Sequence, residues 1–121
     1  MTRPAEGVPE LDELRAIVAE GDGRLEHRIV GETADGLALE SIALGNADPE
    51  VPAVGFFGGV HGLERIGVRV LLTYLRSLVR RLAWDATLHQ QLERVRLVFM
   101  PLVNPSGLLR GTRANANGVD L

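Results

Sequence analysis

The chain has 121 residues, of which 45% are hydrophobic and 24% are charged, which is the composition of one ordinary globular domain. Its formal net charge of −3 gives no electrostatic basis for binding nucleic acid, and the absence of cysteine excludes disulfides and thiolate metal sites. No apolar stretch is long enough to span a membrane, and no signal-peptide pattern follows the N-terminus, so a cytoplasmic protein is expected.

The first third of the chain is expected to contain a helix followed by a hairpin. Residues 1–8 are expected to form a loose lead-in to a helix over residues 10–20, which a proline opens and which carries apolar residues on one face. Two strands are predicted at residues 25–33 and 37–44. They are separated by Ala34-Asp35-Gly36, a sequence typical of tight turns, so the two strands should pair antiparallel.

The rest of the chain is expected to contain one βαβ unit. Residues 53–57 are continuously apolar, which is typical of a strand covered on both faces. Residues 63–83 carry apolar side chains at helical spacing, and a short helical turn is expected at 88–92. Residues 94–103 form the last predicted strand, which should run parallel to the preceding one. We therefore expect an α/β fold: a mixed sheet, with an antiparallel hairpin and a parallel βαβ unit, flanked by helices.

A histidine and a glutamate lie three residues apart at the end of the first strand of this unit. An imidazole and a carboxylate at the spacing of His61 and Glu64 can bind one zinc ion if the chain turns sharply between them. Asn104 follows the neighbouring parallel strand, and ligands of open α/β sheets bind at such carboxyl ends. By itself the pair is a weak signal, because a half-buried histidine followed by a glutamate favoured by the helix dipole has the same pattern.

The end of the chain adds three further motifs. Asn104-Pro105-Ser106-Gly107 is followed by Arg113 and then by Gly118-Val119-Asp120-Leu121. Together with the pair His61 and Glu64, these motifs resemble the zinc carboxypeptidases of the carboxypeptidase A type. The resemblance begins at about residue 37 and covers less than half of a full family domain. It implies that the whole chain is a single incomplete domain, the first part of a carboxypeptidase A-like fold.

The resemblance also assigns roles to individual residues. His61 and Glu64 match the first two zinc ligands, and Asp120 matches the carboxylate that orients the ligand histidine. Arg113 matches the arginine that polarises the scissile carbonyl and stabilises the oxyanion. Ser106 is a departure, because the family usually has aspartate there. The implied activity is zinc-dependent hydrolysis of a peptide or an acylated amino acid. From charge and hydropathy, neither nucleic acid nor a membrane is expected as a partner.

A complete site of this kind needs residues that the sequence does not contain. The third zinc ligand and the catalytic glutamate are expected beyond Leu121. The chain alone is therefore expected to bind zinc weakly, to hydrolyse nothing, and to expose the edge of a parallel strand. Two alternatives remain open: a zinc deacylase of the aspartoacylase and succinylglutamate desuccinylase type, which shares the first ligand pair, and a truncated non-catalytic domain. The sequence leaves the oligomeric state open.

Overall fold

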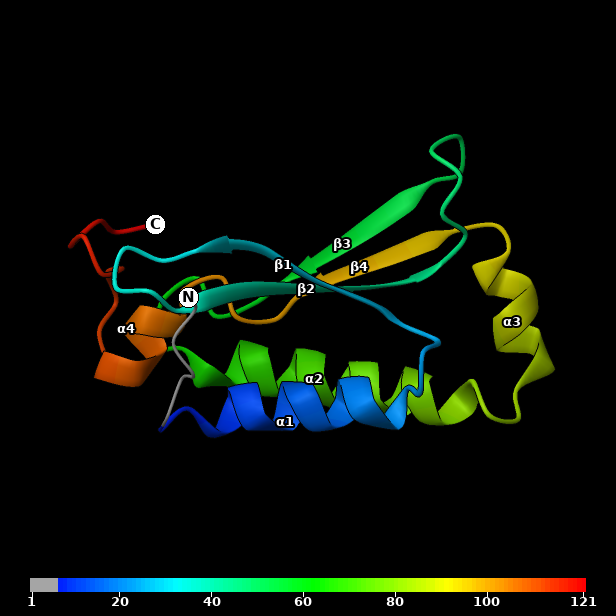
Figure 1. Cartoon of the computed structure of the whole chain (residues 1–121), viewed down its shortest axis with the longest axis horizontal. Helices are drawn as coiled ribbons and strands as arrows, with labels where there is room; N and C mark the ends of the chain where they lie inside the picture. The colour runs from blue at the N-terminus through cyan, green and yellow to red at the C-terminus, as the bar shows by residue number, and fades with distance from the viewer. Residues whose placement is uncertain (1–6) are drawn as a thin grey trace.

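The computed structural model describes residues 7–121, in which a four-stranded sheet carries two long helices on one face (Figure 1). The strands are β1 (Glu26–Glu32), β2 (Ala38–Gly45), β3 (Ala53–Phe57) and β4 (Arg96–Met100). Their order across the sheet is β1-β2-β4-β3. β1 and β2 pair antiparallel, as do β2 and β4, whereas β3 and β4 are parallel. The mixed sheet, its hairpin and its parallel pair confirm the predicted fold class.

The helices of the described residues are α1 (Pro9–Glu20), α2 (Arg65–Arg81), α3 (Ala86–Leu92) and α4 (Pro105–Arg110). α1 and α2 lie side by side under the sheet, and α3 lies at the opposite end of the molecule from α4 (Figure 1). α1 begins with proline, which suits the first helical position because no hydrogen bond is required there. None of the helices within residues 7–121 combines the length and the apolar character that a membrane span requires.

The hydrophobic core lies between the sheet and the two long helices. Phe99 of β4 is fully buried, and Phe56 of β3 stacks on it with ring centroids 4.8 Å apart. Tyr74 of α2 meets Phe56 edge-on at 5.6 Å. Aliphatic residues from α1, β2 and α2 form much of the rest of this core: Leu11, Leu14, Ile17, Ile42, Leu44, Val68, Leu72, Leu75, Leu78 and Val79.

One expectation is wrong at the level of single elements, and one element was not expected. Val8, which was expected in a loose lead-in, is fully buried and precedes the first turn of α1. Residues 1–6 of that lead-in lie outside the described residues. α4 was not predicted, because its six residues include a proline, a serine and a glycine, which are weak helix formers. Its capping and packing, described below, outweigh this low propensity.

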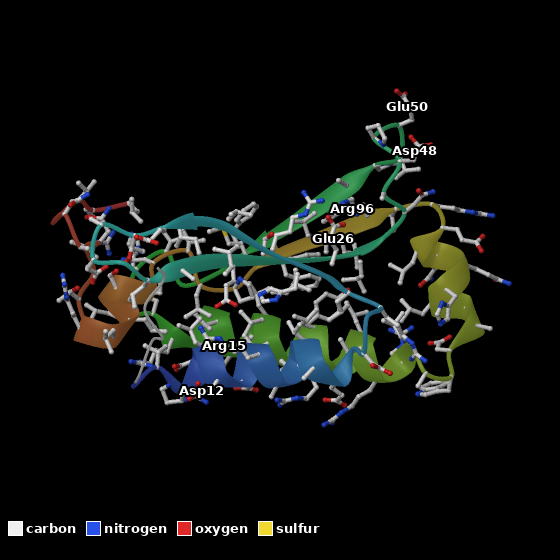
Figure 2. All side chains as sticks on the ribbon, in the orientation of Figure 1. Asp12, Arg15, Glu26, Asp48, Glu50 and Arg96 are labelled. Carbon is white, nitrogen blue, oxygen red and sulfur yellow. The ribbon has the colours of Figure 1, made fainter. Side chains whose placement is uncertain are left out.

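The other face of the sheet has no helix on it within the described residues. β3 is exposed along most of its length, with Val54 at 44% and Phe57 at 65% of full exposure. The prediction that residues 53–57 are covered on both faces is therefore wrong for residues 7–121, because this apolar strand lies at an edge of the sheet. On the open face, Arg96 of β4 binds Glu26 of β1 at 2.6 Å (Figure 2).

Candidate metal centre

The loop between β3 and α2 brings His61 and Glu64 together at the carboxyl end of the parallel strands. The amide of Asn104 donates to the carbonyl of Gly59 at 2.9 Å, which fastens this loop to the segment that follows β4. Gly59 has φ +64°, in the left-handed region that glycine adopts without strain. The chain then turns tightly, with the amide of Glu64 donating to the carbonyl of His61 at 3.0 Å. This turn is the one that the His-x-x-Glu spacing requires.

The distance between the two side chains fits a shared metal ion. His61 Nδ1 lies 3.4 Å from Glu64 Oε1. Zinc binds imidazole nitrogen and carboxylate oxygen at roughly 2.0–2.2 Å in tetrahedral geometry, so two of its ligand atoms lie about 3.3–3.5 Å apart. The observed separation therefore matches that of two adjacent ligands of one zinc ion.

The second ring nitrogen of His61 faces Asp120. Nε2 is buried and lies 3.3 Å from Asp120 Oδ1, although the two atoms are not aligned as a hydrogen bond. Arg113 Nε donates to both oxygens of Asp120, at 3.0 and 2.9 Å, and this hydrogen bond lowers the pKa of the carboxyl group. An ionised carboxylate at Nε2 favours the tautomer with its proton on that nitrogen, which leaves the Nδ1 lone pair available to a metal.

The described residues supply only part of a metal site. Across residues 7–121, no point has three or more histidine, cysteine, aspartate or glutamate side chains gathered around it. Asp120 does not act as a third ligand in this geometry, because it contacts the ring nitrogen that faces away from Glu64. His61 and Glu64 therefore fit two of the four ligand positions of tetrahedral zinc.

Asn104 connects the loop that precedes α2 with the loop that follows α4. Its side chain is 2% exposed, and its Oδ1 accepts the amide of Gly107 at 2.9 Å, which caps α4. Its Nδ2 lies 3.2–3.3 Å from the carbonyl oxygens of Val60, Arg113 and Ala114. Sequence reasoning placed Asn104 at this edge but missed this role. An asparagine followed by proline, a typical start of a helix, is the signal that indicates the cap.

A close backbone contact joins the same two segments. A Cβ atom on Gly62 would lie 2.0 Å from the carbonyl carbon of Gly107 and 2.3 Å from the carbonyl oxygen of Thr112. Only glycine at position 62 allows α4 and the His61 loop to approach this closely. This glycine lies between the two candidate ligands, so the close contact fixes the turn that presents them.

A partly buried ion pair supports the start of α2, directly after Glu64. Arg65 donates to Glu10 Oε1 at 2.7 Å and to the carbonyl of Leu108 at 2.8 Å, which joins α1, α2 and α4. Burial alone would raise the pKa of Glu10, but the hydrogen bond and charge of Arg65 outweigh it, so the pKa is lowered. Glu10 and Arg65 are 55 residues apart, and no local motif indicated their contact.

A second histidine and carboxylate also meet in this structure. His27 Nε2 lies 2.8 Å from Glu40 Oε1, on the face of the sheet that carries the helices. Arg15 lies 3.7 Å from the other oxygen of Glu40, whose side chain is 4% exposed. A guanidinium at this distance already balances the buried carboxylate and repels a second cation. This pair is therefore less suited to a metal than the pair at the strand ends.

Comparison with known proteins relates this arrangement to one family. The family model described as zinc carboxypeptidase matches residues 11–121. Over 95 residues the chain is 33% identical to carboxypeptidase SOL1 of Arabidopsis thaliana, an alignment that covers 76% of this chain and 19% of the plant protein. It is 27% identical over 105 residues to carboxypeptidase D of Homo sapiens, which covers 76% of this chain and 8% of the human protein.

The chain also shares its fold with a solved structure. A metallo-carboxypeptidase from Burkholderia cenocepacia superposes with a TM-score of 0.78 at 20% identity, covering 91% of this chain and 31% of that protein. The chain thus spans less than a third of the Burkholderia protein and about a fifth of the plant relative. Because the family match extends over nearly all of its residues, this chain belongs to the zinc carboxypeptidase family.

Proposed function

We propose that this chain forms part of a zinc-dependent hydrolase of peptide or amide bonds, in which His61 and Glu64 are two of the metal ligands. The observation that carries the proposal is the 3.4 Å separation of His61 Nδ1 and Glu64 Oε1, at the strand ends of a member of this family. When bound in such a site, zinc polarises a carbonyl and lowers the pKa of a bound water to about 7.

Asp120 and Arg113 have supporting roles in this proposal. Asp120 keeps the proton of His61 on Nε2 and stabilises the positive charge that the imidazole gains when it binds a cation. Arg113 holds Asp120 through its Nε–H, and its side chain is 56% exposed. Its terminal N–H groups would donate to the carbonyl oxygen of a substrate and to the oxyanion that forms from it.

The remaining parts of the site are proposed to come from polypeptide other than residues 7–121. A third protein ligand would complete the protein part of the metal shell, and a glutamate would serve as the general base. A peptide is the proposed substrate, because the relatives that match this chain are carboxypeptidases by name. The 121-residue chain alone is expected to leave a dipeptide intact over a day. If hydrolysis is seen and it persists after zinc is removed, the proposed zinc-dependent chemistry is contradicted.

Calorimetric titration with zinc tests the ligand assignment. The unaltered chain should bind one zinc ion with an affinity weaker than micromolar, because two protein ligands hold it. His61→Ala and Glu64→Gln should each abolish the measured heat. His27→Ala is the matched control, since it removes the other histidine that contacts a carboxylate, and it should leave zinc binding unchanged. Submicromolar affinity in the unaltered chain, or zinc binding retained in His61→Ala, would refute the assignment.

A further inference from the structure

The turn between β1 and β2 contacts α4 through one carboxylate that the proposed function does not use. Asp35 Oδ1 accepts hydrogen bonds from Ser106 Oγ at 2.5 Å and from Thr33 Oγ1 at 2.6 Å. Its Oδ2 accepts one from Arg110 Nη2 at 3.0 Å. Ser106 is 1% exposed, so its hydroxyl group has no access to bulk water as an alternative partner. Figure 1 shows this turn and α4 at the same end of the molecule.

α4 depends on such contacts for its position. A helix of six residues is too short to be stable by itself, so the elements around it fix its place. Asp35 binds it through Ser106 and Arg110, and Arg65 binds its Leu108 carbonyl. The capping side chain of α4 in turn binds the carbonyl before His61 and the carbonyl of Arg113. Any shift of α4 therefore shifts both loops of the candidate site.

We propose that Asp35 is a positioning residue for the candidate metal site: it fixes α4 through Ser106 and Arg110, and thereby the loops of His61 and Arg113. The importance of those loops rests on the proposed function, whereas the contacts themselves do not involve zinc. Position 106 is a serine, whose hydroxyl group can donate a hydrogen bond. An aspartate there would place two carboxylates in contact, so the hydroxyl at position 106 and the carboxylate at position 35 are a matched donor and acceptor.

The contact has a defined pH dependence. Hydrogen bonds from Ser106 and Thr33, with the charge of Arg110, lower the pKa of Asp35. Arg110 is the charged group that faces Asp35 from α4, and Thr33 faces it from its own turn. A lowered pKa means that the contact is intact above the ordinary aspartate pKa of about 4 and is lost as the pH falls through the folded-state value.

Native-state hydrogen exchange followed by NMR tests this role. The amides of Gly107 and Thr112 report on α4, because both are hydrogen-bonded within it or at its end. The amide of Leu72, in the core of α2, reports on global unfolding. In Ser106→Ala, protection of the two α4 amides should fall about tenfold more than that of Leu72, the loss expected for one hydrogen bond to a charged group. Ser77→Ala is the control, because Ser77 is an exposed serine on α2, and it should leave the protection of the α4 amides and of Leu72 unchanged.

Two further variants separate positioning from general destabilisation. In Ser106→Asp, α4 protection should be lower than in Ser106→Ala at pH 7 and should recover toward pH 4, because a shared proton then joins the two carboxyl groups. The unaltered chain should keep its α4 protection between pH 7 and pH 4 and lose it only at lower pH, as Asp35 becomes protonated. The double variant Asp35→Asn with Ser106→Asp should restore protection at pH 7, since an amide N–H then donates to the introduced carboxylate.

The results divide clearly. Equal loss of protection at α4 and Leu72 in Ser106→Ala would overturn the proposal, as would a double variant no better protected than Ser106→Asp. If Ser106→Ala fails to fold, the recovery of α4 protection in Ser106→Asp at low pH decides the question. A Ser106→Asp variant whose protection does not recover would also overturn the proposal. None of these measurements requires zinc, so a failure here is distinguishable from a failure of the metal-ligand assignment.

Discussion

His61 lies between two carboxylates that face opposite nitrogens of its ring. The His-x-x-Glu spacing was sufficient to predict the contact with Glu64, because a turn at a strand end is a local feature. The short distance between His61 and Asp120 depends on the position of a loop far along the chain. Only the family resemblance indicated that these two residues are close. The ion pair of Arg113 with Asp120 was not predicted at all, because side-chain pairing within an exposed loop leaves no pattern in the sequence.

The Arg113 ion pair makes a testable difference to the pKa of Asp120. Arg113→Gln should raise this pKa toward its ordinary value, because the hydrogen bond and the charge that lower it are removed. A carboxyl-carbon NMR titration measures the change. Arg80→Gln is the control, since Arg80 binds Glu20 instead and should leave the pKa of Asp120 unchanged. The contribution of ionised Asp120 to the stability of the fold is present above a pH of about 4 and is lost in acid, as the carboxylate becomes protonated. An unchanged Asp120 pKa in Arg113→Gln would exclude this ion pair in solution.

Gly62 provides a steric test of the same turn. Gly62→Ala should lower the free energy of unfolding by about 2 kcal/mol, because the added methyl group collides with the backbone of Gly107. Gly67→Ala is the matched control, since a Cβ there meets no atom within 4 Å and alanine favours the helix, with an expected gain of about 0.5–1 kcal/mol. Urea unfolding measures both. Equal effects of the two substitutions would rule out the close contact.

Among the elements, α4 is the one that the sequence did not reveal and on which the candidate site depends. No helix is expected at the Asn104-Pro105-Ser106-Gly107 motif, because proline, serine and glycine have low helix propensity. The helix forms because Asn104 caps it and because tertiary contacts hold both of its sides. Contacts between residues that are 43 and 71 positions apart are invisible to a local pattern.

The cap of α4 should contribute more to the free energy of unfolding than an ordinary helix cap does. Asn104→Ala should lower the free energy of unfolding by about 2–3 kcal/mol, since it removes a cap and the partner of buried carbonyls in both site loops. Asp85→Ala, which removes the cap of α3, should lower it by about 1 kcal/mol. Thermal or urea unfolding gives both values. A smaller loss for Asn104→Ala than for Asp85→Ala would show that Asn104 does not link the two loops.

For the whole molecule, the sequence predicted the hairpin, the parallel pair and the long amphipathic helix. These features depend on turn residues and on apolar periodicity, which are local properties. The sequence did not predict that β4 lies between β2 and β3, or that one face of the sheet is free of helices in residues 7–121. Strand order depends on contacts distant in sequence, and a continuous apolar run does not distinguish a covered strand from an exposed edge. A cytoplasmic location stays a prediction.

The exposed edge at β3 should make the chain prone to self-association. Phe57→Arg should reduce concentration-dependent association in sedimentation velocity, because a charge on an apolar edge strand opposes pairing between copies. Trp84→Arg is the control, because Trp84 is 73% exposed but follows α2, away from the sheet. Equal reduction by both substitutions would indicate nonspecific hydrophobic association instead of pairing at β3.

The most direct test of the central claim is a nitrogen-15 NMR titration of the three histidine rings with zinc. Nδ1 of His61 should shift with increasing zinc while its Nε2 keeps a proton, and the rings of His27 and His89 should be unaffected. A response at His27 or His89 with none at His61, or zinc bound through Nε2 of His61, would contradict the proposed site.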